Sequence, residues 1–193
     1  MSPLREGPTN MDSAILVLSI VGKGQKIPGR TALQKISYFT NEVLHSSIAF
    51  KPHLYGPFSP EVAASSDVLV SACLLREEIE RGSFVKSGKE QEWTRHTYSL
   101  TDDGKKYCTW LANKPDLIEP EAKVREVVLK LKAETDLDPD ILSKLAKVHF
   151  IRKTCGIDAP SPAIISKAAR KYGWNVPVGV VRQSLITIDR LAL

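Results

Sequence analysis

The sequence predicts a mainly α-helical chain with a small β wing, and three observations support this fold class. Apolar residues recur at helical spacing in three successive segments between residues 12 and 73. Two strand-like segments then flank a polar loop that contains glycine. Helical spacing returns after residue 101, and the later segments begin at or just after prolines. At 193 residues, the length suits one domain with an appendage or two small domains.

The first two helices are predicted from their starts, their ends and their apolar spacing. Asp12 suits the N-cap of the first helix, which stops near Gly22. The second helix is expected to begin after Gly29, and its apolar residues recur at spacings of three and four, so one face belongs to the core. The residues predicted to face outward are Arg30, Gln34, Ser37 and Asn41.

The third helix has the strongest start signal in the chain. Residues 46–58 are rich in turn formers and predict a short extended piece followed by a tight turn. Ser59 then provides an N-cap, with Pro60 at the first helical position and Glu61 in the first turn. The predicted buried stripe of this helix comprises Val62, Ser66, Leu69 and Cys73.

Two extended segments are predicted after the third helix, at residues 75–79 and 95–100. The intervening stretch RGSFVKSGKEQE predicts a long, charged loop at the tip of a hairpin. Thr101 and the two following aspartates favour a new helix start. Tyr107, Cys108 and Leu111 of that helix are expected to point inward.

The chain is predicted to divide into a flexible tail at residues 1–11, a mixed domain at 12–114 and a helical appendage at 115–193. Four helices are expected in the appendage, at about residues 120–134, 139–152, 162–172 and 177–191. Their apolar stripes suggest a homodimer, because they offer more apolar face than a small appendage needs. The residues of these stripes are Val124, Val127, Val128, Leu131, Val181, Leu185 and Ile188.

The predicted elements follow the chain order of a winged helix-turn-helix domain, which has three helices, a strand, a polar loop, a strand and a further helix. The stretches GRTALQKISYF and YGPFSPEVAASSDVLVSACLL resemble the YwgA-type winged-helix family of small bacterial and archaeal proteins. A looser likeness is to SocA-like antitoxin domains. The resemblance implies a winged helix and a transcriptional or defence-related regulator. Cys73 departs from the family pattern, which usually has glycine at this position.

Net charge, hydropathy and cysteine content favour some classes of function and exclude others. The net charge is +5, and residues 1–118 contribute +1 (14 Lys and Arg against 13 Asp and Glu), whereas residues 119–193 contribute +4 (13 against 9). A basic chain is attracted to polyanions, so nucleic acid is a reasonable partner. No apolar run is long enough for a membrane span, and three cysteines far apart predict buried thiols in a reducing cytoplasm.

The expected partner is double-stranded DNA, bound mainly through its phosphates by the wing and by helix starts. The third helix would lie over the groove, although its outward positions supply serines and no Lys or Arg. A basic helix pair at residues 161–185 is a possible second reader of DNA, or a packing or dimerising helical hairpin with an ordinary helix end at Gly173. The candidate contact residues are Arg30, Lys35, Ser59, Ser65, Ser71, Arg81, Lys86, Lys89, Arg95, Lys167, Arg170, Lys171 and Arg182.

The alternative function is a winged-helix adaptor or antitoxin-like module that binds protein through the third helix. An enzyme is not expected, because the four histidines lack cysteine or carboxylate partners at ligand spacing and no phosphate-binding glycine loop is present. The acidic residues at 136, 138 and 140 lack the glycine and terminal glutamate of a calcium loop. No cofactor or metal is therefore predicted.

Overall fold

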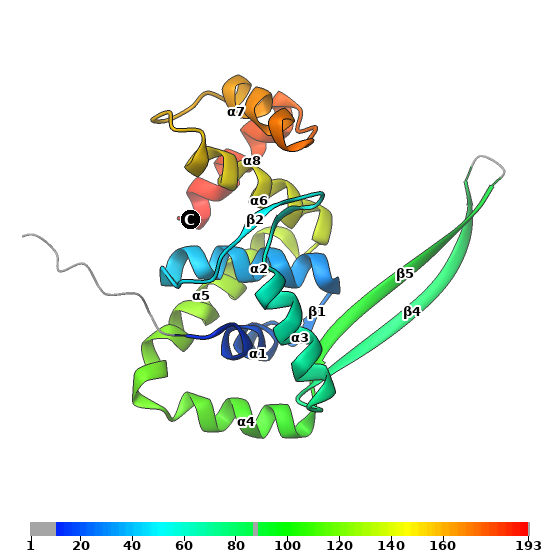
Figure 1. Cartoon of the computed structure of the whole chain (residues 1–193), viewed down its shortest axis with the longest axis vertical. Helices are drawn as coiled ribbons and strands as arrows, with labels where there is room; N and C mark the ends of the chain where they lie inside the picture. Colours follow the sequence, from blue (N-terminus) through cyan, green and yellow to red (C-terminus); the bar gives the residue numbers. More distant parts are fainter. Residues whose placement is uncertain (1–10, 87–88, 193) are drawn as a thin grey trace, which may run out of the picture.

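The computed structural model describes residues 11–86 and 89–192, and it is mainly helical with a long β hairpin (Figure 1). The fold class predicted from the sequence is confirmed. In chain order the elements are α1 (Ser13–Gly24), β1 (Lys26–Ile27), α2 (Gly29–Leu44), β2 (Lys51–His53), β3 (Gly56–Phe58), α3 (Pro60–Ser71), β4 (Leu75–Lys86), β5 (Lys89–Leu100), α4 (Asp102–Ala112), η1 (Pro115–Leu117), α5 (Ile118–Thr135), α6 (Pro139–Thr154), α7 (Pro162–Ala169), η2 (Arg170–Tyr172) and α8 (Val178–Leu191).

The predicted helix starts are confirmed by their capping hydrogen bonds. The Asp12 carboxylate accepts from the backbone N–H of Ile15 at 2.8 Å. Ser59 and Thr101 cap α3 and α4 in the same way, each accepting from an N–H three residues later. These caps are local in sequence, which is why residue type and spacing were sufficient to predict them.

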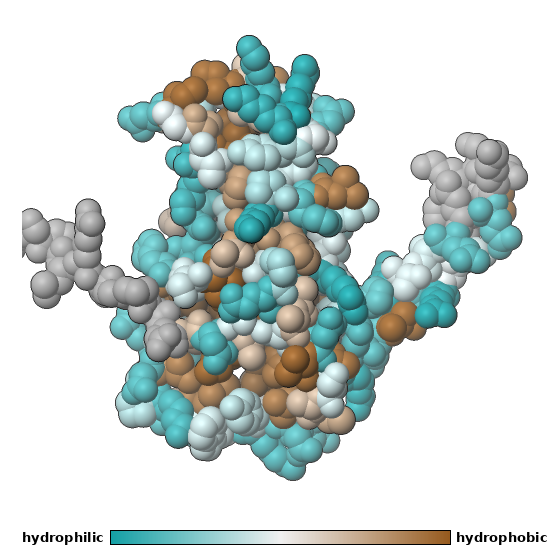
Figure 2. All heavy atoms as spheres, viewed as in Figure 1, coloured by the Kyte–Doolittle hydropathy of each residue, from teal (hydrophilic) through white to brown (hydrophobic). Residues whose placement is uncertain are grey.

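The hairpin β4–β5, here called the wing, is longer than predicted. Its strands pair without interruption from Leu75 opposite Leu100 to Lys86 opposite Lys89, and the short β1 adds to the base of β5. The prediction of a twelve-residue polar loop is therefore wrong. The wing extends away from the body (Figure 1), and most of the surface that Figure 2 shows for it is hydrophilic. A strand solvated on both faces lacks the apolar alternation by which strands are predicted.

The C-terminal helices share one core with the winged helix. α5 packs against α1 and α2, and α6 also packs against α2. The core contains residues from both sides of the predicted boundary, including Ile36 and Phe39 of α2 with Val128 and Leu131 of α5. Residues 12–114 and 115–193 are thus two parts of one packed unit.

The apolar stripes from which a homodimer was predicted are covered by this packing. Six of the seven stripe residues are buried within the chain itself, and Leu185 is partly buried against the same core. The stripes therefore leave no apolar face for a second copy, and the homodimer remains a prediction without structural support. Residues 1–10 of the predicted tail lie outside the described residues, whereas Met11 is only 3% exposed and belongs to the core.

The short β2–β3 hairpin is fastened to the body by three side chains from distant segments. Trp174 Nε1 donates to the His53 carbonyl at 2.7 Å, and Ser143 Oγ donates to the Tyr55 carbonyl at 2.9 Å. Lys35 Nζ donates to the Pro57 carbonyl at 2.8 Å. Gly56 has φ +101° here, a region that side-chain-bearing residues rarely adopt. The predicted tight turn is thus a fixed link between α2 and α6.

Several predictions of burial are wrong. Cys73 is exposed, with φ +57°, and Tyr107 is 39% exposed. Gln34, Ser37 and Asn41 were expected to face solvent, yet all are buried, because α2 is surrounded by β3, α3, α5 and α6. In the described part of the chain, no helix combines the length and the hydropathy that a membrane span requires.

Candidate functional site

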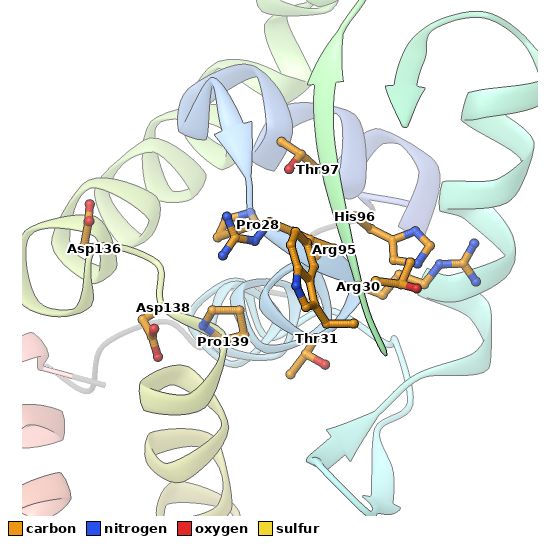
Figure 3. A pocket seen from close by; sticks show the side chains of 12 residues that line it. Pro28, Arg30, Thr31, Arg95, His96, Thr97, Asp136, Asp138 and Pro139 are labelled. Atoms are coloured by element: carbon orange, nitrogen blue, oxygen red, sulfur yellow. The ribbon is translucent and has the colours of Figure 1, made fainter. Parts of the chain in front are cut away.

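An open groove with a volume of about 740 Å³ lies between the wing, the start of α2 and the loop that joins α5 to α6 (Figure 3). Trp93 and Arg95 of β5 line it from the wing, and the Arg95 guanidinium lies 5.6 Å from the centre of the Trp93 ring. Asp136 and Asp138 line it from the other side. The groove therefore brings opposite charges together, which weakens its attraction for a phosphate.

Glycine is required opposite Trp93. Gly82 pairs with Trp93 across the wing, and a Cβ on Gly82 would lie 2.7 Å from the indole ring. The ring therefore lies across the backbone of β4 and remains 38% exposed. The structure thus presents an aromatic ring beside an exposed cation on one face of the wing.

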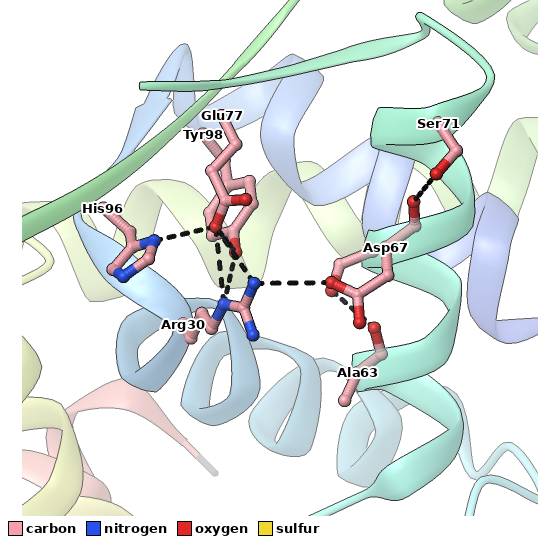
Figure 4. Close-up of polar contacts among 8 residues, drawn as sticks. Arg30, Ala63, Asp67, Ser71, Glu77, His96 and Tyr98 are labelled. Atoms are coloured by element: carbon pink, nitrogen blue, oxygen red, sulfur yellow. Dashed lines mark hydrogen bonds and ion pairs between the residues drawn. The ribbon is translucent and has the colours of Figure 1, made fainter. Parts of the chain in front are cut away.

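The other face of the wing carries a polar cluster centred on Arg30, which connects α2, α3 and the wing (Figure 4). Arg30 Nε donates to the Tyr98 hydroxyl at 3.1 Å. Its Nη2 lies 3.3 Å from the Glu77 carboxylate and 3.5 Å from the Asp67 carboxylate. Two carboxylates therefore compensate the charge of Arg30, which was expected to contact a DNA phosphate.

Glu77 is the acceptor at the centre of this cluster. Tyr98 donates to it at 2.5 Å, and His96 Nδ1 lies 2.8 Å away. Partial burial opposes ionisation of Glu77, but hydrogen bonds from Tyr98, His96 and Arg30 outweigh it, so the pKa of Glu77 lies below its usual value. A charged Glu77 fixes the orientation of Arg30 toward α3.

Lys35 and Ser59 were predicted to contact DNA, and their placement shows that this is wrong. Lys35 is only 2% exposed, and its ammonium donates to the Pro57 carbonyl. Burial, together with the nearby charge of Lys147, lowers the pKa of Lys35 to about 7. Ser59 is fully buried, and its backbone exchanges two hydrogen bonds with the Gln34 side chain. Both residues stabilise the fold.

The exposed face of α3 is acidic and apolar. Glu61, Asp67 and Val68 are exposed, and Val68 is 62% exposed. The two other candidate serines are already bonded within the chain, since Ser65 Oγ lies 2.7 Å from Ser13 Oγ and Ser71 Oγ donates to the Asp67 carbonyl. This helix contains no Lys or Arg. It lacks the donors that usually dominate contacts with phosphates and with guanine.

The wing continues this surface. Side chains alternate along a strand, so Ile79, Arg81 and Val85 share the face that carries Glu77. Ile79 is 48% exposed and Val85 is 74% exposed. We define the α3–wing face as the exposed residues of α3 together with this face of the wing. It comprises Pro60, Glu61, Ala64, Asp67, Val68 and Ser71 of α3, Arg30 at the start of α2, and Glu77, Ile79, Arg81, Ser83, Val85, Glu90, Glu92, Thr94 and His96 of the wing.

Of the remaining predicted contact residues, Arg81 belongs to this surface, and Arg95 and the C-terminal cations lie apart from it. Arg81 and Arg95 are exposed on opposite faces of the wing, and the side chains of Lys86 and Lys89 lie outside the described residues. Lys167, Arg170, Lys171 and Arg182 are exposed on α7, η2 and α8, at the opposite end of the molecule from the base of the wing (Figure 1). The structure therefore separates the predicted cations into distinct surfaces.

Gly173 ends the helical segment before Trp174, as expected for an ordinary helix end. Its φ is +70°, and its N–H donates to the Arg170 carbonyl. Trp174 is buried and donates its backbone N–H to the Ala169 carbonyl at 3.1 Å. This geometry agrees with the packing hairpin that was weighed against a second DNA reader.

The sequence did not reveal the roles of Glu77, Tyr98 and Trp93, or the pairing of Asp67 with Arg30. Arg30 and Glu77 are 47 residues apart, and no local pattern links them. The position of Trp93 depends on its pairing with Gly82. This pairing was not expected, because both residues lie between the two predicted strands. Within the described residues, no group of three or more His, Cys, Asp and Glu is placed to hold a metal ion.

Comparisons with known proteins add no functional assignment. No protein-family model matches the chain. A search of curated proteins also found no match. The resemblance noted in the sequence therefore stays a prediction, and the arguments for function come from the surface described above.

Proposed function

We propose that the chain is a winged-helix protein-interaction module that binds a protein partner through the α3–wing face. The observation that carries the proposal is the character of α3, which exposes Val68 beside Glu61 and Asp67 and has no cation. Exposed apolar residues surrounded by polar ones are typical of surfaces that bind proteins. The same features disfavour insertion of α3 into a DNA groove.

The surface also suggests the chemistry of the partner. Val68, Ile79 and Val85 offer apolar contact. Glu61, Glu90 and Glu92 are exposed and supply negative charge, whereas Asp67 and Glu77 are paired with Arg30. A segment with apolar residues flanked by Lys or Arg would complement both features. A toxin-like partner, as the SocA-like resemblance implies, is one protein that such a module would bind.

Affinity capture from a lysate of the source organism tests this function. We expect wild-type protein to retain a stoichiometric protein partner, and Val68→Arg and Ile79→Arg to lose it. Ile141→Arg is the matched control, because Ile141 is 41% exposed on α6 and is not one of the residues of the α3–wing face. Equal capture by all variants would contradict the proposal.

Binding to double-stranded DNA is a second candidate, favoured by the exposed Arg81 and Arg95, the ring of Trp93 and the net charge of +5. Fluorescence anisotropy with a labelled random duplex, at low and at physiological salt, tests it. If DNA is the partner, affinity falls steeply with salt, and Arg81→Glu with Arg95→Glu reduces both the affinity and the salt slope. Salt-independent or absent binding removes this candidate.

A further inference from the structure

A second cavity, of about 360 Å³, lies at the end of the molecule that carries α7, between the C-terminal part of α6, the loop after it, and α7 with η2. Ile151, Ile157, Ile164 and Tyr172 give it an apolar interior, and Lys167 and Lys171 line it as well. Figure 2 shows hydrophobic and hydrophilic surface side by side over α7. Its volume falls at the small end of the range typical of ligand pockets.

The apolar residues of this cavity remain accessible to solvent. Ile157 is 48% exposed, Ile164 is 39% exposed and Tyr172 is 40% exposed. A ligand that covers them gains the free energy of removing apolar surface from water. Three exposed apolar side chains that line one concave site are therefore a better indication of binding than the same residues scattered singly.

One wall of the cavity is held in place by aromatic packing. The Tyr172 ring lies 5.9 Å from the Phe150 ring in an edge-on arrangement and 5.2 Å from the Trp174 ring. Trp174 is itself buried and hydrogen-bonded to His53. The wall therefore rests on the core, and little conformational entropy is lost when a ligand packs against it.

Lys167 and Lys171 lie one helical turn apart at this cavity. Both are exposed, and neither forms an ion pair with any carboxylate of residues 11–86 and 89–192. Two uncompensated ammonium groups beside an apolar interior attract a molecule that has an anionic group at one end. The lysines also disfavour a purely apolar occupant, because covering them would remove their hydration.

We propose that this cavity binds a small amphipathic monoanion, with an aromatic or branched apolar body against Ile157, Ile164 and Tyr172. Its carboxylate or sulfonate group lies between Lys167 and Lys171. The site is separate from the α3–wing face, so it functions whether that face binds a protein or DNA.

The first test titrates the whole chain with 1-anilinonaphthalene-8-sulfonate, a fluorescent monoanion with a two-ring-system apolar body. We expect saturable binding at one site, weakened about tenfold or more by Ile164→Glu, which places a negative charge in the cavity. Ile141→Glu is the matched control, since Ile141 has nearly the same exposure but lies elsewhere on α6. Absent binding, or equal binding by both variants, overturns the proposal.

The second test isolates the two lysines and does not depend on the folding of the Ile164 variant. N-phenyl-1-naphthylamine has the same apolar body without the sulfonate. Replacing Lys167 and Lys171 by Gln is expected to weaken binding of the sulfonate about fivefold to tenfold and to leave the neutral compound unaffected. Gln at Lys132 and Lys144, both exposed elsewhere, is the control. Equal weakening of both compounds, or of neither, overturns the role of the lysines.

Discussion

The two β hairpins of this protein differ in what holds them. β2–β3 has strands of three residues, and hydrogen bonds from Lys35, Ser143 and Trp174 fasten it to α2, α6 and the segment after η2. The wing has strands of twelve residues, and beyond its base it is held by its own strand pairing. The short hairpin is thus part of the body, whereas the long hairpin is free to contact a partner.

The cationic residues predicted to contact DNA differ between the two hairpins in the same way. Lys35 was expected to hold a phosphate, but its ammonium is used inside the body to bind the short hairpin. Arg81 and Arg95 remain exposed on the long one. A cationic residue therefore says little about partners until its neighbours in space are known.

The largest effect on stability is expected from removing one of the three side chains that fasten the short hairpin to the body. Trp174 is 2% exposed and bonded to His53, so Trp174→Ala should lower the free energy of unfolding by about 3–5 kcal/mol. Trp93→Ala on the wing should cost less than about 1 kcal/mol, because Trp93 is 38% exposed. Urea denaturation measures both, and similar losses would show that the wing is not free.

A smaller effect on stability, which depends on pH, is expected from the ionisation of Lys35. Its pKa is about 7 in the folded protein and near 10.5 in the unfolded chain, so between these values the unfolded chain binds more protons. The free energy of unfolding should therefore rise with pH, by about 1–2 kcal/mol between about pH 6.5 and about pH 8.5. Well below the folded pKa both states are protonated, and this contribution is constant.

Lys35→Met should flatten that rise, and Lys132→Met at an exposed position should not. Two other buried groups change their contribution mainly outside this window. Burial lowers the pKa of His149 from 6.5 to about 4, so its contribution changes mainly between these two values and is complete shortly above the lower edge of the window. Burial raises the pKa of Cys108 from 9.0 to about 11, so its contribution changes mainly between those two values and begins at the upper edge of the window; both contributions are present in wild type and in Lys35→Met. A rise of equal size in wild type and Lys35→Met would show that Lys35 is not the source.

A modest increase in stability is expected from a substitution at the connection between α3 and the wing. Cys73 has φ +57° and is exposed, so Cys73→Gly should relieve backbone strain and stabilise the protein by about 0.5–1 kcal/mol. Ala72→Gly, at φ −78°, should destabilise it slightly by making the unfolded chain more flexible. Thermal unfolding of the two variants distinguishes them, and a loss in Cys73→Gly would refute the argument from strain.

The smallest effect on stability is expected from shortening the wing. Glu80 pairs with Arg95, so replacing residues 81–94 by Asn-Gly joins the strands through a two-residue turn of matching register. The free energy of unfolding should change by less than about 1 kcal/mol, because the removed part makes few contacts with the core. Capture of the protein partner should nevertheless be lost. A large loss of stability would mean that the wing supports the body.

The local features of the fold could be predicted from the sequence, but the long-range ones could not. Asp12, Ser59 and Thr101 were predictable caps because each acts on the turn that follows it. The surroundings of α2 were not predictable, because its second face is covered by α5 and α6, which lie far away in the sequence. This is why Lys35 and Asn41 were expected in solvent.

The candidate site shows the same limit. The exposed face of α3 was correctly described as free of cations, since helical spacing alone defines it, but of its serines only Ser71 is exposed. The pairing of Arg30 with Glu77 and Asp67 requires the packing of three elements. The length of the wing was missed because polar residues on both faces carry no strand signal.

The most direct test of the α3–wing face is photocrosslinking in the source organism, with p-benzoylphenylalanine in place of Val68 and, as a control, in place of Ile141. Both positions are exposed, but only Val68 lies on the proposed surface. We expect one protease-sensitive adduct, of defined mass, from position 68 and none from position 141. A nuclease-sensitive adduct at position 68, or the same adducts at both positions, would contradict a protein-binding α3–wing face.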